Sequence, residues 1–532
     1  MFNKKENGVT PEIEKNQKYA LLSVSNKEDI VDFARTIYLK LGYRIISTGG
    51  TGNVLGEGGV PFVPIQEITG NPECFEGRMK TISFQIESGI LYDRTKPSQQ
   101  KEAQEFGIKP IDLVVCNLYP FEKTIQKPSV TFEEAIENID VGGPTMVRAA
   151  AKNHKNVLVV VDPRDYQRVA EALQKGTATE EFRREMAAKA FFHLSLYDSL
   201  VARYLNKELF PEEMTIPGRK IINLRYGENP HQDGAFYSIP NTEAPLNKLK
   251  RITGRELSLI NLTDINAGIE SVRFFDTPAA VVIKHNSPCG IALGRTSVEA
   301  LVRAIESDPD SAFGGVAVLN WFMDVEATKV LRSFKDERKS NMDIVAVPGI
   351  SDEAVELLKN IRETLGIYTF GEIPKQRIDY NMKPVEGGFV LQTADSDIEE
   401  SFEQWEVVSK VKPTAKQLEQ MEIAWKFISR IRSNSVIVVD KDLPMTRGIG
   451  SGQTSRFRST KIALEQAGKF AKGGILASDS FFPFGDSTEH ALRKEIGAIV
   501  QQGGSVNDKD SINLADKAGI PMVFTHRRAF WH

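Results

Sequence analysis

Cysteine is scarce in this chain, and its scarcity argues against two kinds of site. Cys74, Cys116 and Cys289 are the only three among 532 residues, and no two of them form a Cys-x-x-Cys pair. An odd number of widely spaced cysteines does not build a disulfide framework, so we expect a protein of the reducing cytoplasm. A zinc site needs three or four ligands placed together, which these cysteines and seven scattered histidines do not supply locally. We therefore predict no catalytic metal.

Long apolar runs and an excess of positive charge are also missing. No uninterrupted apolar run approaches the length of a membrane span, and residues 1–18 are too polar for a signal peptide. We expect no membrane segment and a frayed or disordered N-terminus over these residues. Lys plus Arg 67 against Asp plus Glu 71 gives a net charge of −4, so no overall basic field favours nucleic acid.

The composition and length that remain are those of a multidomain α/β enzyme. Hydrophobic content is 41%, and 532 residues predict two to four domains. The first region, 19–208, opens with a strand, an amphipathic helix over 30–41 and a second strand, and it closes with a long helix over 180–207. The second region, 209–532, resumes the alternation of strands and helices.

A faint internal repeat lies within the second region. A double glycine precedes an apolar strand at 312–320 and again at 471–480. The repeat suggests two similar subdomains, although chance explains it equally well, since Gly-Gly before a strand is frequent.

An apolar run over 279–283 stops at Lys284 and His285, and turn-forming residues follow. We interpret the run as a buried parallel strand, and ligands in α/β sheets gather at the carboxyl ends of such strands. His285 can accept a proton near neutral pH, while the ammonium of Lys284 can stabilise a developing anion. The dipeptide alone does not distinguish this role from a strand end with no catalytic part.

Glycine-rich turns in the first region indicate phosphate binding. The stretch 47–52 follows a strand and leads towards a helix, where backbone N–H groups can converge on an anion. It lacks the GxxxxGK[ST] spacing of a nucleoside-triphosphate loop. A second such turn, 140–145, places Pro144 at the expected first helical position, although a simple helix start explains it as well.

Other polar stretches do not indicate a function when each is taken singly. Residues 77–81 and 152–155 carry cations but are also typical of a surface loop and a helix end. Residues 225–232 combine an arginine suited to phosphate with a tyrosine suited to stacking. The segment 287–290 matches half of the Pro-Cys-x-x-Cys of zinc deaminases, but position 292 is alanine and no His-x-Glu precedes it.

The order of these motifs resembles one known family. The chain contains in sequence SVSNK, STGGT, EGRMKT, CNLYPF, IDVGGPTMVRAAAKNH, RYGENPHQ, VVIKHNSPCG, SAFGG, RSNSVIVV, GIGSGQTSR, SDSFFPFGD and QQGGSVND. Together they resemble the bifunctional purine biosynthesis family, which couples 5-aminoimidazole-4-carboxamide ribonucleotide (AICAR) formyltransferase to IMP cyclohydrolase. The resemblance runs from about residue 19 to 532.

The resemblance implies an architecture and partners. It implies a methylglyoxal-synthase-like α/β domain for the cyclohydrolase over 19–208, then a formyltransferase region over 209–532 built of two cytidine-deaminase-like subdomains without zinc. It further implies a cytoplasmic homodimer with transferase sites at the subunit interface. The small molecules implied are AICAR, formyl-AICAR and 10-formyltetrahydrofolate as co-substrate.

Residue roles in the transferase also follow from the resemblance. Lys284 and His285 match the family's catalytic pair, with His285 as the base, and Asn434 matches the residue that orients the substrate. Ribonucleotide contacts are implied for Arg225, Tyr226 and Arg528. The folate side is implied for Phe313, Gly314, Asp343, Phe481 and Asp486.

In the cyclohydrolase the resemblance assigns proton handling and charge stabilisation to four residues, and substrate binding to a larger set. The four are Lys80, Tyr119, Asp140 and Lys152. The binding set is Ser25, Lys27, Ser47, Thr48, Gly49, Gly50, Thr51, Arg78, Thr81 and Gly142.

The chain departs from the family pattern at three places. Residues 82–87 read ISFQIE where the family continues Leu-His-Pro and then a further histidine, so two histidines are absent and an acid has entered. Gly485 and Ala529 stand where arginine and histidine are common. The first departure leaves open a formyltransferase whose N-terminal domain is weakened or only senses nucleotide. A zinc deaminase and a purine-nucleotide sensor without turnover are the other rival interpretations.

Overall fold

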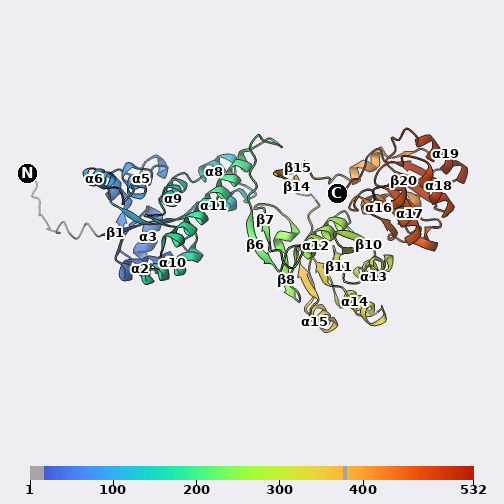
Figure 1. The fold of residues 1–532 in the computed structure, drawn as a ribbon, viewed down its shortest axis with the longest axis horizontal. Helices are drawn as coiled ribbons and strands as arrows, with labels where there is room; N and C mark the ends of the chain where they lie inside the picture. The colour runs from blue at the N-terminus through green and yellow to red at the C-terminus, as the bar shows by residue number, and fades with distance from the viewer. Residues whose placement is uncertain (1–16, 339, 376–379) are drawn as a thin grey trace, which may run out of the picture. The chain divides into compact units, whose positions relative to one another are not determined.

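Two compact units make up the described part of the chain (Figure 1). This computed structural model describes residues 17–338, 340–375 and 380–532. Unit 1 comprises the described residues up to Gly218 and Ile239–Asn241, and unit 2 comprises Arg219–Ser238 and Thr242–His532. The sequence predicts a division after residue 208. All but the last two residues of the expected frayed segment lie outside the described residues.

Unit 1 is built on a five-stranded parallel sheet of order β3-β2-β1-β4-β5. Its elements are β1 Lys18–Val24, α2 Ile30–Leu41, β2 Tyr43–Ser47, α3 Gly49–Glu57, β3 Val63–Pro64, α4 Ile65–Thr69, η1 Phe75–Gly77, α5 Phe84–Leu91, α6 Pro97–Glu105, β4 Ile111–Asn117, α7 Phe121–Ile125, α8 Phe132–Glu137, α9 Gly142–Lys152, β5 Leu158–Val160, η2 Pro163–Asp165, α10 Tyr166–Lys175 and α11 Glu180–Leu205.

Both faces of this sheet are covered. Leu21 of β1 packs in one apolar cluster with residues of α5, α9 and α11, whereas its neighbour Leu22 packs in another with residues of α2 and α10. Successive residues of a strand point to opposite faces, so a sheet buried on both sides needs uninterrupted apolar strands. The expected helix over 30–41 and the long helix from residue 180 are confirmed, and α9 begins at Gly142 rather than at Pro144.

Unit 2 contains two six-stranded sheets and two separate hairpins. Its elements are β6 Arg219–Leu224, β7 Gly234–Ser238, η3 Pro245–Lys248, β8 Lys250–Thr253, α12 Leu259–Val272, β9 Ala279–Lys284, β10 Ser287–Leu293, α13 Ser297–Ser307, β11 Val316–Leu319, α14 Val325–Arg338, β12 Ile344–Val347, α15 Asp352–Ile361, β13 Gly366–Thr369, β14 Tyr380–Val385, β15 Gly388–Thr393, η4 Glu399–Gln404, β16 Glu406–Val407, α16 Ala415–Ile428, β17 Val436–Val439, β18 Thr446–Gly450, α17 Arg456–Ala467, η5 Gly468–Ala471, β19 Ile475–Ser478, α18 Asp486–Arg493, β20 Ala498–Gln501, α19 Asp508–Ala518 and β21 Met522–Phe524.

The two six-stranded sheets share one topology. The first subdomain has the order β10-β9-β11-β12-β13-β8, and the second has β18-β17-β19-β20-β21-β16. Each begins with an antiparallel hairpin, continues with three mutually parallel strands and ends in an antiparallel edge strand. The common topology supports the internal repeat that the two double glycines suggested.

The strand that leads to Lys284 differs from its prediction. β9 is buried as expected, but it runs antiparallel to both of its neighbours, β10 and β11. An apolar run indicates that a strand is buried on both faces, but it does not indicate the direction of the neighbouring strands. The prediction of a parallel strand was therefore wrong. The chain turns back directly after Lys284, and His285 therefore lies at a hairpin tip.

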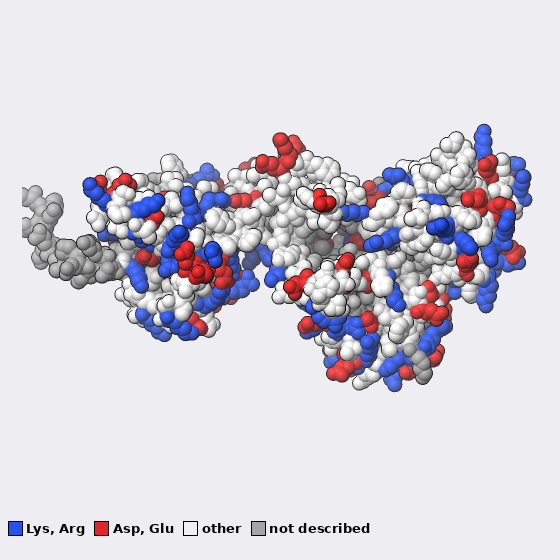
Figure 2. Space-filling view, in the orientation of Figure 1, with Lys and Arg blue, Asp and Glu red and all other residues white. Residues whose placement is uncertain are grey.

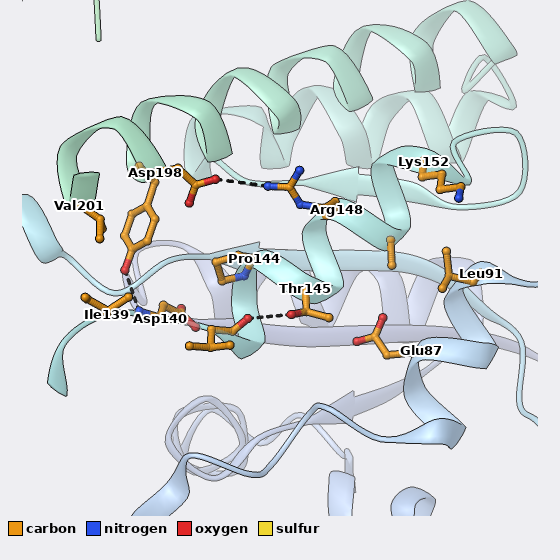
Figure 3. A pocket seen from close by; sticks show the side chains of 13 residues that line it. Glu87, Leu91, Ile139, Asp140, Pro144, Thr145, Arg148, Lys152, Asp198 and Val201 are labelled. Carbon is orange, nitrogen blue, oxygen red and sulfur yellow. Dashed lines mark hydrogen bonds and ion pairs between the residues drawn. The ribbon is translucent and has the colours of Figure 1, made fainter. Parts of the chain in front are cut away.

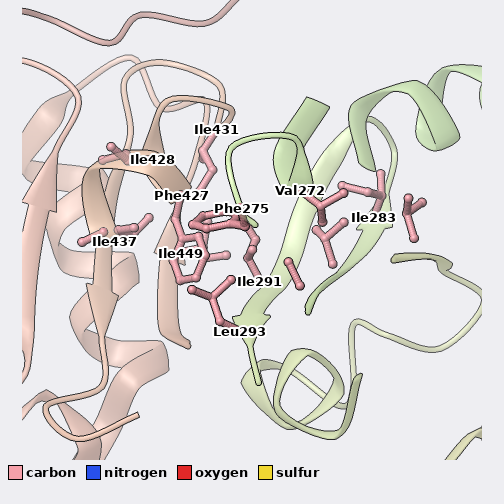
Figure 4. Close-up of a cluster of buried hydrophobic side chains, with 14 of the residues drawn as sticks. Val272, Phe275, Ile283, Ile291, Leu293, Phe427, Ile428, Ile431, Ile437 and Ile449 are labelled. Atoms are coloured by element: carbon pink, nitrogen blue, oxygen red, sulfur yellow. The ribbon is translucent and has the colours of Figure 1, made fainter. Parts of the chain in front are cut away.

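The two sheets meet along β10 and β18. Leu293 donates its N–H to the carbonyl of Pro444 at 2.8 Å, and Ile291 donates its N–H to Thr446 Oγ1 at 3.1 Å. Beside this junction Phe275 packs edge to face on Phe427, with ring centroids 5.5 Å apart (Figure 4). The contacts fix the ends of both hairpins relative to each other.

Charged side chains on the visible face are mixed in sign. Figure 2 shows lysine and arginine interspersed with aspartate and glutamate over each unit. Among the described residues, no helix combines the length and the apolarity that crossing a bilayer requires.

Candidate active sites

His285 lies exposed at the tip of the β9–β10 hairpin. His285 and Asn286 form a two-residue turn with φ angles of 58° and 59°, the left-handed conformation that a type I′ turn requires at both positions. The N–H of Asn286 donates to Asp264 Oδ1 at 2.6 Å. Asp264 lies on α12, so this helix holds the turn from behind while the imidazole faces solvent.

Lys284 is fixed next to the predicted folate side. Its Nζ donates to the carbonyl of Phe313 at 2.7 Å and lies 5.9 Å from the centre of the Phe313 ring. Phe313 is 55% exposed, and Gly314 adopts a φ of 70°, which glycine takes without steric cost. The structure therefore brings Lys284, Phe313 and Gly314 together, as the sequence predicts.

Asn434 approaches the same tip from the second subdomain. Ser287 Oγ, next to the turn, lies 3.3 Å from Ser451 Oγ, and the neighbouring Gln453 accepts hydrogen bonds from Asn434 through its carbonyl. The β10–β18 junction produces this proximity. The Asn434 side chain is held from the other side, since Arg456 donates to its Oδ1 at 2.7 Å.

A buried ion pair supports Asn434. Arg456 donates to Asp479, and these two residues are 7% and 0% exposed. Asp479 Oδ2 also accepts the N–H of Ser435 at 3.0 Å. A buried charge pair with its hydrogen bonds satisfied fixes geometry, and here it fixes the residue that presents an amide to the site.

The C-terminal segment adds Arg528 to this neighbourhood. Ala529 donates its N–H to the carbonyl of Asp479 at 2.8 Å, which fixes the segment against the ion pair. Arg528 is exposed and stacks on Phe530, with 4.8 Å from its guanidinium carbon to the ring centre. The predicted cation therefore lies on the side of Asn434.

Arg225 and Tyr226 are tied to the first turn of α12. The N–H of Arg225 donates to Leu257 at 2.8 Å, and Tyr226 accepts the N–H of Leu259 at 3.0 Å. The guanidinium of Arg225 stacks over the Tyr226 ring at 4.6 Å. The same helix that holds the His285 turn thus positions the two predicted ribonucleotide contacts.

The remaining predicted folate residues are arranged less clearly. Asp343 accepts hydrogen bonds from Arg255 at 2.5 Å and Arg362 at 2.8 Å, so its carboxylate is already paired. Phe481 is half-buried in the loop after β19, and Asp486 is exposed as the first residue of α18. A flat ring fits best against Phe313, which offers an open aromatic face.

In unit 1 the segment that carries the predicted binding residues Ser25 and Lys27 lies beside the predicted phosphate-binding turn at 47–52. Ser23 Oγ is 3.1 Å from Thr48 Oγ1, and Thr51 Oγ1 accepts the N–H of Val24 at 3.0 Å. Thr48 is the N-cap of α3, so the free N–H groups of Gly49 and Gly50 lie at a helix N-terminus, which favours an anion.

Lys27 adds a cation to this cradle. Its Nζ lies 3.3 Å from Thr51 Oγ1, and partial burial lowers the pKa of the lysine. Asn117, at the end of β4, accepts the N–H groups of Ser25 and Asn26 at 2.6 and 2.8 Å and so shapes the loop that carries Lys27.

Asp140 and Tyr119 meet at the adjacent strand end. The Asp140 carboxylate accepts the N–H of Gly143 at 2.8 Å and that of Tyr119 at 3.3 Å. Burial raises the pKa of Asp140, and these two N–H groups oppose the rise. Thr81 lies against Gly142, because a Cβ on that glycine would meet Thr81 Oγ1 at 2.6 Å. Tyr119 is 45% exposed.

The predicted cations of unit 1 are more dispersed. Lys80 forms an ion pair with Glu73 at 2.7 Å, and Arg78 pairs with Glu137. Lys152 is the last residue of α9, whose eleven residues span roughly 16 Å, so it lies far along the helix from Asp140. Lys152 and Asp140 therefore lie near opposite ends of α9 and not next to each other.

A cavity of about 480 Å³ follows α9 between these two residues (Figure 3). Glu87 of α5 lines this cavity and belongs to the segment 82–87, where the chain departs from the family pattern. One of its carboxylate oxygens is buried without a hydrogen-bond partner. Burial raises the pKa of Glu87 to about 7. Arg148, which also lines the cavity, pairs with Asp198 at 3.3 Å.

Sequence reasoning did not identify several residues that shape these sites. Asn117 lies in the CNLYPF motif and Arg456 ends the GIGSGQTSR motif, so both carried a weak signal. Asp264 lies within a helix twenty-one residues before His285, and only the fold shows its contact with the turn. In the described part of the chain, no three His, Cys, Asp or Glu side chains gather as a metal site would need.

Two family models match successive parts of the chain. A family model described as AICARFT/IMPCHase bienzyme matches residues 150–466, and one described as an MGS-like domain matches residues 29–145. The bifunctional purine biosynthesis protein PurH of Thermoanaerobacter sp. (strain X514) is 46% identical over 97% of this chain and 100% of its own length. This chain belongs to that family. It is accordingly a bifunctional formyltransferase and cyclohydrolase.

Other members are similarly close. The PurH proteins of Halalkalibacterium halodurans and Listeria monocytogenes serovar 1/2a are 42% and 44% identical, each over 97% of this chain and 100% of its own length. The crystal structure of ForH covers 36% of this chain and 100% of its own at 35% identity, with a TM-score of 0.33 that is too low for a comparison of folds.

Proposed function

We propose that unit 2 transfers the formyl group of 10-formyltetrahydrofolate to the 5-amino group of AICAR, with His285 as the general base. The observation that carries this assignment is the exposed His285 at the hairpin tip, beside Lys284, where the adjacent Ser287 lies 3.3 Å from Ser451 of the second subdomain. The amine of AICAR is a weak nucleophile because it is conjugated with the carboxamide. Base assistance and fixed geometry are what such an attack needs.

Each residue then has one task in the transfer. As the amine nitrogen bonds to the formyl carbon, His285 takes the proton that the amine loses. The carbon then releases the folate nitrogen, which leaves with the bonding electron pair and takes up a proton. Lys284 stabilises the negative charge on the formyl oxygen, and Asn434 orients the substrate through its amide.

Substrate contacts complete the assignment. Arg225 and Arg528 bind the anionic part of the ribonucleotide, and Tyr226 packs against its ring. Phe313 and Gly314 form the folate side beside Lys284. Phe481, Asp486 and Asp343 belong to this side as well, Asp343 through the two arginines that it holds.

Unit 1 closes formyl-AICAR to IMP by attack of the carboxamide nitrogen on the formyl carbon and loss of water. Ser25, Lys27, Ser47 and the turn 48–51 bind phosphate, supported by the helix N-terminus at Thr48. Asp140 accepts the proton of the attacking amide, and its burial suits that task. Lys80 and Tyr119 stabilise the oxyanion, and Arg78, Thr81 and Gly142 contact the substrate. Lys152 balances charge.

The assembly we propose is a cytoplasmic homodimer. The hairpins β6–β7 and β14–β15 are two-stranded sheets that pair with no third strand among the described residues. They expose apolar side chains such as Tyr237 and Phe389. An isolated two-stranded hairpin is marginally stable in water, so a second copy that covers these hairpins would stabilise both.

One observation favours a second candidate for unit 1. Glu87 places a carboxyl with one unpartnered oxygen in the cavity along α9, and it belongs to the segment 82–87 from which two family histidines are absent; this favours a weakened cyclohydrolase or a nucleotide-sensing domain. Separate assays of the two half-reactions on the purified chain decide between the candidates. Turnover of supplied formyl-AICAR to IMP supports a working cyclohydrolase, and tight binding of IMP without turnover supports the sensor.

A further inference from the structure

Asp264 is a buried acid that none of the roles above uses. It is 4% exposed on α12, and its Oδ1 accepts the N–H of Asn286 at 2.6 Å. Burial raises the pKa of Asp264 to about 6, while the Asn286 N–H and the nearby His285 oppose that rise. A carboxylate thus lies directly behind the turn that carries the exposed imidazole.

The turn has a structural need for such an anchor. His285 and Asn286 both adopt the left-handed conformation, which is sterically unfavourable for a side chain such as that of His285. A hydrogen bond from a charged acceptor is stronger than one between neutral groups, so the Asp264 carboxylate offsets part of this cost. An amide or hydroxyl at position 264 would supply the hydrogen bond but not the charge.

The ionisable groups that can act on this carboxylate lie on α12 and on the elements packed against it. α12 packs against β9, β10 and β11, and the ionisable groups on these strands are Lys284 and the Cys289 thiol, with His285 directly after β9. Burial raises the pKa of Cys289 to about 12, so the thiol is neutral. On α12 itself, Glu270 is paired with Arg273 at 2.9 Å. Arg225 is tied through its backbone to Leu257, just before α12. Among these groups, His285 is the one whose charge lowers the pKa of Asp264.

We infer that Asp264 is a positioning residue for His285, whose carboxylate both holds the turn and stabilises the imidazolium that forms when His285 takes the proton of the amine. A base oriented by a third group is a common arrangement in proton-transfer catalysis. The inference rests on the proposed role of His285 in formyl transfer. It adds a buried carboxylate as the third member of the arrangement.

The test separates the charge from the hydrogen bond. Asp264→Asn keeps an acceptor oxygen for Asn286 and removes the charge. The kcat for formyl transfer is measured for wild type and Asp264→Asn from pH 5 to pH 8.5, with saturating AICAR and 10-formyltetrahydrofolate. We expect wild type to exceed the variant about tenfold at pH 8, where the carboxylate is ionised. The ratio should fall towards one as the pH drops through about 6, where Asp264 becomes protonated.

A role limited to folding predicts a different result. A ratio that is the same at every pH, or equal activity at pH 8, overturns the inference. Asp264→Glu keeps the charge and moves it by one methylene, so it should retain a pH-dependent advantage over Asp264→Asn. Should Asp264→Asn fail to fold, the pH profile of Asp264→Glu against wild type decides instead: a loss of kcat that is unchanged between pH 5 and pH 8 overturns the inference.

Two controls complete the design. Asp336→Asn removes an exposed acid on α14 whose ion pair with Arg332 is 3.7 Å long, and it should leave the kcat profile unchanged. His285→Ala tests the proposed function by itself. If His285→Ala retains transfer, the proposed base is wrong. If it abolishes transfer while Asp264→Asn shows no pH-dependent loss, only the present inference fails.

Discussion

The two subdomains of unit 2 have the same strand order but different hairpin tips. In the first, β9 and β10 are joined by His285 and Asn286 alone, anchored by a buried acid. In the second, β17 and β18 are joined by residues 440–445, and the first acid of that loop, Asp440, is paired with Arg447 at 2.7 Å. The same strand order therefore presents an exposed histidine at the tip of one hairpin and an internal ion pair at the tip of the other.

The two hairpin tips lie at opposite ends of the β10–β18 junction. The antiparallel β10–β18 junction puts the tip of the first hairpin beside the start of β17, and it puts the tip of the second beside Leu293 at the far end of β10. The two tips therefore cannot serve one site. In the transfer that we propose, the first subdomain supplies a base from its tip, and the second supplies an amide from the opposite end of its hairpin.

We expect the largest effect from removal of the imidazole of His285, which distinguishes the β9–β10 tip. His285→Ala should lower kcat for formyl transfer about 10²–10⁴-fold, because positioned bases contribute on that order. Conversion of supplied formyl-AICAR to IMP by unit 1 should not change. Both rates are measured on the same preparation, and loss of the two together would refute separate sites.

The second subdomain should be most sensitive at its buried ion pair. Arg456→Gln leaves Asp479 charged and without its partner, which costs about 3–5 kcal/mol of unfolding free energy. The matched control is Arg493→Gln in the same subdomain, which breaks an exposed pair with Glu489 and should cost less than about 1 kcal/mol. Urea unfolding compares the variants, and equal losses would mean that burial does not distinguish the pairs.

Glu87 of unit 1 is a half-buried acid that forms no ion pair with any described residue, and it can be compared with the paired acids of unit 2. The pKa of Glu87 is about 7, above the value of 4.5 expected in the unfolded chain, so folding favours the protonated carboxyl. The free energy of unfolding therefore falls as the pH rises from about 4.5 to 7. Glu87→Gln should therefore stabilise unit 1 at pH 8 by about 1–3 kcal/mol.

The gain from Glu87→Gln should vanish at pH 4.5 and below. Hydrogen exchange of the amides in α5 at both pH values measures it. An equal gain at pH 4.5 and pH 8 would show that the carboxyl is not protonated in the folded chain.

The smallest expected effects compare the two double glycines directly. Gly314 and Gly473 have φ angles of 70° and 75° at equivalent places before β11 and β19. Alanine at either position should cost about 1 kcal/mol of stability. Only Gly314→Ala should also lower formyl transfer, because Gly314 adjoins Phe313 and Lys284. Thermal unfolding and transferase assays of both variants test this, and equal effects on transfer would remove the functional difference between the subdomains.

The sequence predicts more of the local structure than of the long-range contacts. Strand and helix patterns indicated β9, α2 and α11, because apolar periodicity reports burial. The same periodicity does not report strand direction, so the antiparallel pairing of β9 was missed. Glycine-rich turns indicated the cradle around Thr48, and the order of motifs indicated His285 and Asn434.

What the sequence did not predict depends on residues far apart in the chain. Asp264 meets Asn286 only because α12 packs against β9, and Arg456 meets Asn434 only because α17 packs on β17. Asp264 stands in no pattern that differs from an ordinary helix residue, and the glycine-rich motif that contains Arg456 does not show which residue the arginine contacts. Contacts of this kind become visible only when the elements are packed.

The shared edge between β10 and β18 also limits how this chain can be divided. An edge strand with unpaired N–H and C=O groups is a template for pairing with other chains. A truncated polypeptide that ends before residue 400 would present the β10 edge and the apolar surface around Phe275 to water. We expect such a fragment to aggregate during expression, whereas a cut after Gly218 would leave both edges protected.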